Sequence, residues 1–173
     1  EGLDAKFLTR PAEQTELPDR SFDVVTAAQS FLYFDRDRAV AEVKRLLAPG
    51  GRLVTCHIGW LPRQDAVAKR TEELVLQHNP DWTAADFTGE VPASPSWIGA
   101  DFGVSAFFVY QEAIPFTRES WRGRIRACRG VGAAMTPEQV EAFDREHAAL
   151  LARTVPERFT VLHWINAHIL APR

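Results

Sequence analysis

The chain has 173 residues with 20 basic and 23 acidic side chains, and its net charge of −3 gives it no general attraction for nucleic acid or for an anionic membrane surface. A hydrophobic fraction of 46% and a charged fraction of 25% are ordinary for a globular domain with a buried core. No apolar run reaches the ~18 residues of a membrane span, no secretory signal opens the chain, and two cysteines are too few for a disulfide scaffold. We therefore expect a cytoplasmic protein that does not bind membranes.

The first strands are predicted from short apolar runs between turn-forming residues. Lys6–Thr9 is a strand candidate, and the loop after it contains Pro11 and Pro18. Phe22–Ala27 is short, rich in β-branched residues and bounded by polar turns, so we expect a strand that is buried on both faces.

A helix and a second buried strand follow. Apolar residues at positions 39, 40, 43, 46 and 47 fall on one helical face, which predicts a helix from Asp37 to Leu47. Pro49-Gly50-Gly51 then ends the helix, because a glycine there can adopt the left-handed conformation. Arg52–His57 is the next strand. The order strand, helix, strand with short links predicts a βαβ unit and hence a parallel sheet.

The rest of the chain alternates between helix caps and extended runs. Thr136-Pro137-Glu138-Gln139 is a capping box with proline at the first helical position, and Asn79-Pro80 ends the preceding helical pattern. We expect helices over 65–78, 117–129 and 136–155, strands over 104–116 and 158–170, and a long irregular excursion over 80–103.

Three blocks of sequence resemble one enzyme family in their order and spacing. They are Ala12-Glu13 to Ser21-Phe22-Asp23-Val24-Val25, then Gln29-Ser30-Phe31-Leu32-Tyr33-Phe34-Asp35, and then Glu42-Val43-Lys44-Arg45-Leu46-Leu47-Ala48-Pro49-Gly50-Gly51. Together they resemble the region from the third to the fifth strand of class I S-adenosylmethionine-dependent methyltransferases, of the type 11-like, small-molecule kind.

The resemblance implies an α/β fold with an incomplete Rossmann-like methyltransferase sheet, in which parallel strands are followed by a C-terminal antiparallel pair. The family's N-terminal strands and glycine-rich turn have no counterpart here, because the only Gly-x-Gly is Gly130-Val131-Gly132 and it follows a predicted helix. At about 30 residues for each βαβ unit, the resemblance implies that at least ~60 residues are missing upstream. Residues 1–173 are then a single truncated domain, with 1–57 on the cofactor side and 58–173 on the substrate side. The inner edge of the Phe22–Ala27 strand should be exposed.

The resemblance also implies a cofactor, S-adenosyl-L-methionine, and residues beside it. In the family, the loop that matches Ala12 and Glu13 lies beside the adenine, and the residues that match Ala28 and Gln29 lie beside the methionine part. Pro11 is a departure, since many family members have an acidic residue there that can accept a hydrogen bond from the adenine. In an open α/β sheet, ligands bind outside the carboxyl ends of the strands, which is where Ala28 and Gln29 are expected.

His57 is the candidate catalytic base, because it ends a strand on the expected ligand side and imidazole titrates near neutral pH. The alternative is a histidine bonded to the backbone at the edge of the core. Phe31, Tyr33 and Trp60 are candidate walls of a substrate pocket, although aromatic residues near strand ends are more often part of the core.

Arginines crowd the helix predicted over 117–129, and Arg118, Arg122 and Arg126 share one face. Arg122 is thus a candidate ligand for an anionic acceptor such as a carboxylate, and a solvated helix face is the favoured alternative. The histidines and cysteines lack zinc-site spacing, so no metal is expected, and no Gly-x-Ser-x-Gly hydrolase motif is present.

Two functions remain open at this point. The first is transfer of a methyl group from S-adenosylmethionine to a small-molecule acceptor, which needs the absent N-terminal segment. The second is a non-catalytic remnant that binds or dimerises through the exposed sheet edge, forming a homodimer.

Overall fold

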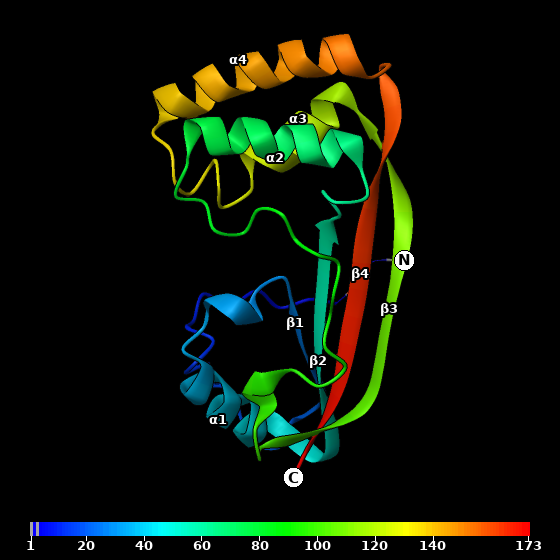
Figure 1. The fold of residues 1–173 in the computed structure, drawn as a ribbon. Coiled ribbons are helices and arrows are strands. Elements are labelled where there is room, and N and C mark those ends of the chain that lie inside the picture. The colour runs from blue at the N-terminus through cyan, green and yellow to red at the C-terminus, as the bar shows by residue number, and fades with distance from the viewer. Residues whose placement is uncertain (1, 3) are drawn as a thin grey trace. The chain divides into compact units, whose positions relative to one another are not determined.

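A computed structural model describes residue 2 and residues 4–173 of the chain. In order, its elements are β1 (Phe22–Ala28), α1 (Arg36–Leu46), β2 (Leu47–Trp60), α2 (Ala66–His78), β3 (Phe102–Thr117), α3 (Arg118–Arg126), α4 (Pro137–Thr154) and β4 (Arg158–Pro172), with 3-10 turns at Phe31–Tyr33 and Ser96–Ile98 (Figure 1). The four strands form a mixed sheet in the order β1-β2-β4-β3. The α/β fold with parallel and antiparallel strands is therefore confirmed.

The chain divides into two compact units, each made of separate stretches of sequence. The first unit consists of residues 1–57, 92–109 and 166–173, and the second of residues 58–91 and 110–165. The strands β2, β3 and β4 each have residues in both units.

The first unit contains the predicted βαβ arrangement. Strands β1 and β2 are parallel neighbours, with Val25 opposite Leu53 and Ala28 opposite Cys56. Helix α1 connects them and begins at Asp35, whose side chain accepts a hydrogen bond from the Arg38 backbone N–H. The helix stops at Leu46, and Pro49-Gly50-Gly51 lies in the first part of β2, where Gly50 has a φ of 84° and the pairing with β1 shifts register.

The core of the first unit joins α1 to one side of β1 and β2. Its buried side chains come from β1, α1, β2, the 92–103 segment and β4, and they are Ala27, Phe31, Ala39, Val40, Val43, Leu47, Leu53, Ile98, Phe102 and Leu170. All five apolar positions of the predicted helical stripe are buried. The periodicity that predicted the helix therefore marks the face that packs in the core.

Two expectations about the first strands are wrong. Residues 4–21 contain no strand, and Phe7 in the middle of the Lys6–Thr9 candidate is 93% exposed. A strand needs a neighbour for its backbone hydrogen bonds, and none lies beside these residues in the described part of the chain. The β1 strand is also not buried on both faces, because Val24 is 51% exposed and only Ala27 is fully buried. Since β1 ends the sheet, its inner edge is open, as expected.

The second unit contains the helices α2, α3 and α4, which lie together in Figure 1. Asp65 caps α2 by accepting hydrogen bonds from the backbone N–H groups of Val67 and Ala68. Thr117 and Thr136 open α3 and α4 with capping boxes. The helices thus begin where local signals predicted, and the core between them is built on Trp121, Ile125, Phe143, Leu151 and Val161, all fully buried.

Helix α3 ends at Arg126, three residues earlier than predicted. The chain turns back at once, with Cys128 N–H donating to Ile125 O and Gly132 N–H to Cys128 O. A Cβ on Gly132 would lie 2.3 Å from the Arg126 carbonyl oxygen, so only glycine fits this approach. The Gly130-Val131-Gly132 sequence therefore belongs to a tight turn after a helix.

In the described part of the chain, no helix is long and apolar enough to cross a membrane. No group of three or more histidine, cysteine or acidic side chains among these residues is arranged to hold a metal ion.

Candidate active site

The carboxyl end of β1 brings Gln29 next to Cys56 and His57 of β2 at one rim of the first unit. Ala28, the last residue of β1, pairs with Cys56, and the Gln29 backbone N–H donates to the Cys56 carbonyl oxygen over 2.9 Å. His57 follows Cys56 directly in β2. Gln29, which directly follows β1, and His57 on β2 thus lie where the parallel pairing of the two strands ends, a place where α/β sheets bind ligands. The prediction that His57 ends its strand is wrong, because β2 continues beside β4 as far as Trp60.

Gln29 adopts a left-handed backbone conformation, with a φ of 58°. This conformation costs a residue with a Cβ about 1 kcal/mol or more, and such residues are concentrated at functional sites. The hydrogen bond to Cys56 holds it in place. The turn sends the chain away from the sheet, so the residues that follow lie beyond the strand end.

The loop that contains Ala12 and Glu13 is fixed to the amino end of α1. A Glu13 carboxylate oxygen accepts a hydrogen bond of 2.8 Å from the Asp35 backbone N–H, and both Ala12 and Glu13 are half-buried in a turn. In a βαβ unit the helix begins near the carboxyl end of the preceding strand. The loop is therefore held on the side of the unit to which β1 leads.

A buried carboxylate fixes the next part of the same loop. Glu42 on α1 is 8% exposed, and its Oε1 accepts hydrogen bonds from the Thr15 backbone N–H (2.8 Å) and hydroxyl (2.6 Å). The Arg45 guanidinium donates to the same carboxylate and to the Leu17 carbonyl oxygen. Hydrogen bonds from Arg45 and Thr15 lower the pKa of Glu42 to about 2. The part of the loop from Thr15 to Leu17 is therefore held against α1 by the Glu42 carboxylate and the Arg45 guanidinium.

His57 is half-buried and faces polar residues of β4, the neighbour of β2 in the sheet. Burial lowers the pKa of His57, the Asn166 amide raises it as a hydrogen-bond partner for the protonated ring, and the nearby His168 lowers it. The net effect is a lowered pKa. The imidazole is therefore neutral at neutral pH, the state in which it can accept a proton.

His168 is held in one orientation. It is 3% exposed, its Nε2 lies 2.9 Å from the Pro92 carbonyl oxygen, and its ring stacks on Phe107 with centroids 4.6 Å apart. Because a carbonyl oxygen only accepts, the Nε2 atom carries the hydrogen. Neither Asn166 nor His168 stood out in the sequence, because their relation to His57 depends on β4 lying beside β2.

The aromatic candidates of the first unit have different environments. Phe31 is 6% exposed and packs in the core against Phe34 and Trp97, with ring centroids 5.9 Å and 4.4 Å away. Tyr33 is 54% exposed. The 3-10 turn at Phe31–Tyr33 thus places one ring inward and leaves the other accessible.

Trp60 belongs to the second unit and is surrounded by that unit's side chains. Its indole N–H donates to Glu72 Oε1 over 2.6 Å, its ring meets Trp121 edge-on, and the Arg124 guanidinium lies 5.1 Å from the ring centroid. Glu72 also accepts from the Asp86 backbone N–H, and burial raises its pKa. The surroundings of Trp60 are thus those of a core residue with a polar handle.

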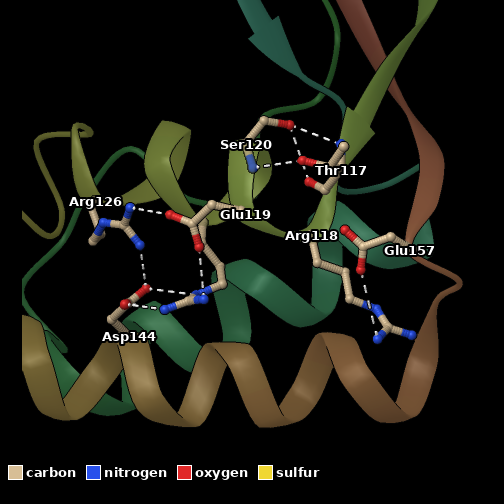
Figure 2. A network of polar contacts seen from close by, with 8 residues as sticks. Thr117, Arg118, Glu119, Ser120, Arg126, Asp144 and Glu157 are labelled. Atoms are coloured by element: carbon tan, nitrogen blue, oxygen red, sulfur yellow. Dashed lines mark hydrogen bonds and ion pairs between the residues drawn. The ribbon is translucent and has the colours of Figure 1, made fainter.

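Arg122 is engaged by carboxylates of its own unit. Its guanidinium donates to both oxygens of Asp144 on α4, one of them over 3.0 Å from Nε, and to Glu119 over 2.8 Å. Arg126 joins the same network, and Arg118 pairs with Glu157, as Figure 2 shows. The arginine face of α3 therefore packs against α4, an arrangement that favours a structural role for Arg122.

Comparison with known proteins shows which family the first 55 residues resemble. A family model for a methyltransferase domain matches residues 1–55. Residues 1–55 are thus similar in sequence to methyltransferase domains. A demethylmenaquinone methyltransferase of Thermus thermophilus is 48% identical over 54 residues, which are 31% of this chain and 24% of that protein. An uncharacterized methyltransferase of Mycobacterium tuberculosis is 50% identical over 42 residues, or 24% of this chain and 17% of the relative.

Solved structures extend the likeness to nearly the whole chain at the level of the fold. A protein described as a type II methyltransferase of Anaeromyxobacter dehalogenans is 20% identical with a TM-score of 0.55, over 95% of this chain and 70% of that one. A Bacillus halodurans protein described as a methyltransferase is 16% identical with a TM-score of 0.50, over 97% of this chain and 78% of that one. The chain thus has the class I methyltransferase fold, while its sequence matches span less than a quarter of those curated relatives.

Proposed function

We propose that this protein takes part in methyl transfer from S-adenosyl-L-methionine to a small-molecule acceptor. The proposal rests on the contacts of Cys56. Ala28 pairs with Cys56 in the sheet, and the Gln29 backbone N–H donates to the Cys56 carbonyl oxygen. Gln29 and His57 therefore lie at one rim of the sheet. The methyltransferase match over residues 1–55 supports the same reaction class.

The residues on this rim fit the cofactor in two respects. The Ala12–Glu13 turn is fixed beside the start of α1, and Ala28 is an exposed strand end followed by the left-handed Gln29. We assign the adenine side of the cofactor to Ala12 and Glu13 and its methionine side to Ala28 and Gln29. When bound, the cofactor supplies a methyl group on a positively charged sulfur. The Glu13 carboxylate already accepts from Asp35, so contact through the loop backbone is favoured.

His57 is proposed as the base that removes a proton from a hydroxyl or ammonium acceptor. Its lowered pKa keeps the ring neutral at neutral pH, and general base catalysis contributes about 10²–10⁴-fold to rates. Tyr33, the exposed aromatic side chain after the β1 rim, is the best candidate for contact with the acceptor. Orientation of acceptor and cofactor supplies the rest of the rate enhancement.

The proposal is tested by titrating S-adenosylhomocysteine into two proteins. One is the 173-residue chain, and the other is the same chain preceded by two βα units with a glycine-rich turn, taken from a methyltransferase that binds the cofactor. We expect saturable binding heat only from the longer protein, and a weaker affinity in its Gln29→Ala variant. If the folded longer protein does not bind, or if the variant binds as tightly, the cofactor assignment is wrong.

A second candidate function rests on the open edge of β1. Val24 is 51% exposed, and β1 has β2 as its one neighbour among the described strands. Unpaired strand edges with apolar side chains favour pairing with another strand. We therefore propose a homodimerising, non-catalytic module as the alternative, and the molar mass from light scattering distinguishes it from a monomer.

A further inference from the structure

Asn166 is a buried side chain whose oxygen is not used by the fold. It lies on β4 at 2% exposure, and no donor in the described part of the chain forms a hydrogen bond with its Oδ1 atom. Leaving a buried acceptor unpaired costs about 1–3 kcal/mol. Such a cost at one position calls for a reason, and a functional one is common.

The location of Asn166 gives that reason. Strand β4 lies beside β2 in the sheet, and the Asn166 amide raises the pKa of His57 by favouring its protonated ring. His168, two residues further along β4, lies on the same face of the strand. It is held by Pro92 and Phe107 and does not compete for the amide.

We propose that Asn166 is a positioning residue for His57, whose amide oxygen accepts a hydrogen bond from the His57 ring once that ring carries a proton. The neutral ring that can accept a proton carries its single N–H on the nitrogen away from the acceptor, and no N–H is aligned with the Asn166 oxygen in this state. When the nitrogen that faces the acceptor takes a proton, the whole ring becomes positively charged, and the N–H on the other nitrogen becomes a stronger donor that the Asn166 oxygen can accept. Because the Asn166 amide is uncharged, it can lie beside the His57 ring in the neutral and in the protonated state.

This inference rests on the proposed function for its catalytic meaning, but its physical content can be measured without methyl transfer. The protonation midpoint of His57 is followed by NMR of the imidazole Cε1–H in the full chain, and the resonance is assigned with His57→Gln. We expect Asn166→Leu to lower the midpoint, because the protonated ring loses its acceptor. We expect Asn166→Asp to raise it, because a carboxylate stabilises the protonated ring more strongly.

Two further variants make the test selective. Asn79→Leu is the matched control, because Asn79 donates to the Gly130 carbonyl oxygen in the second unit, and it should leave the His57 midpoint unchanged. His168→Gln should raise the midpoint, since the neighbouring histidine opposes protonation. If Asn166→Leu does not fold, the upward shift in Asn166→Asp still tests the proposal.

An unchanged midpoint in folded Asn166→Leu, or in folded Asn166→Asp, overturns the positioning role. Failure of the proposed function has a different signature, because the midpoint still shifts in these variants while the extended protein of the previous section does not bind S-adenosylhomocysteine. In that extended protein, if it methylates an acceptor, the acidic limb of the pH–rate profile should move with the NMR midpoint.

Discussion

The Asp144 carboxylate on α4 receives hydrogen bonds from Arg122 on α3, one of them over 3.0 Å from Nε to Oδ1. Arg126 donates to the same carboxylate over 2.8 Å. Burial alone would raise the pKa of Asp144, but its bonds to the two arginines lower it overall. One half-buried carboxylate thus ties two helices of the second unit together.

Removing this carboxylate should weaken the second unit. We expect Asp144→Asn to lower the free energy of unfolding by about 1–3 kcal/mol, because two guanidinium groups lose a charged partner in a partly desolvated place. Urea denaturation at neutral pH measures the change. Glu141→Gln on the exposed side of α4 is the control and should change it by less than about 0.5 kcal/mol. Equal effects of the two substitutions would show that the network is not important for stability.

The loop anchor on Glu42 should make the first unit sensitive to acid. The pKa of Glu42 is about 2 in the folded protein against 4.5 ordinarily, so its contribution to stability is complete above 4.5 and is lost as the pH falls towards 2. Glu42→Gln should remove this pH dependence and reduce stability at neutral pH by about 1–3 kcal/mol. Urea midpoints between pH 5 and 2 measure both effects. A variant that keeps the wild-type slope in this range would contradict the assignment.

His147, the buried histidine of α4, should make the unfolding free energy depend on pH over a higher range than Glu42 does. His147 is fully buried, its Nε2 lies 3.3 Å from the Thr71 hydroxyl, and burial lowers its pKa to about 4 from 6.5. The folded state therefore excludes a proton that the unfolded chain binds. We expect the unfolding free energy to fall by up to about 3 kcal/mol from this group as the pH drops from 6.5 to 4.

The variant His147→Leu should reduce the dependence of the unfolding free energy on pH between 6.5 and 4. His163, also buried with a lowered pKa, remains as a smaller source of slope. His78→Gln is the control for loss of a histidine, because His78 contacts Glu146, whose side chain is 59% exposed. If His147→Leu has the wild-type slope between pH 6.5 and 4, the histidine is not the cause of the acid sensitivity.

The backbone of Gln29 makes its own prediction. Gln29→Val should destabilise the protein by about 1–2 kcal/mol, because β-branched residues fit the left-handed region poorly. Gln29→Asn should cost less than about 0.5 kcal/mol in backbone strain, since asparagine tolerates this conformation. Thermal unfolding of both variants gives the comparison. A smaller loss for valine than for asparagine would mean that the turn does not need its positive φ.

The open edge of β1 can be tested by its effect on assembly. If a homodimer pairs through β1, Val24→Lys should shift it to monomer, because lysine on an edge strand opposes pairing. Val104→Lys on the other edge strand, β3, is the matched control and should leave the dimer intact. Light scattering after size-exclusion chromatography measures the mass. A wild-type monomer at all concentrations, or dissociation only by Val104→Lys, excludes pairing through β1.

Elements with local signals were predictable from the sequence. Asp65, Thr117 and Thr136 cap helices because their side chains bond to N–H groups two or three residues away, and such signals are complete within one short segment. The parallel pairing of β1 and β2 was predictable for a similar reason, since a helix with short links leaves few other arrangements.

Features that depend on distant parts of the chain were not predictable. Burial of β1 depends on what covers its two faces, and in the described part of the chain Val24 stays 51% exposed. The effect of Asn166 and His168 on His57 could not be predicted for the same reason, since it depends on β4 lying beside β2 in the sheet. Gln29 was found because its position after a strand coincided with a family motif, although its left-handed backbone has no sequence signature.

The interleaved make-up of the two units has a consequence for limited proteolysis. The segment from Asn79 to Asp101 crosses from one unit to the other at residues 91 and 92, and a single cut within it leaves each unit assembled from pieces on both sides of the break. Neither piece carries a whole unit, so cleavage should yield a nicked protein whose two fragments co-purify until a denaturant is added. For the same reason, neither unit can be expressed by itself through shortening the gene from one end.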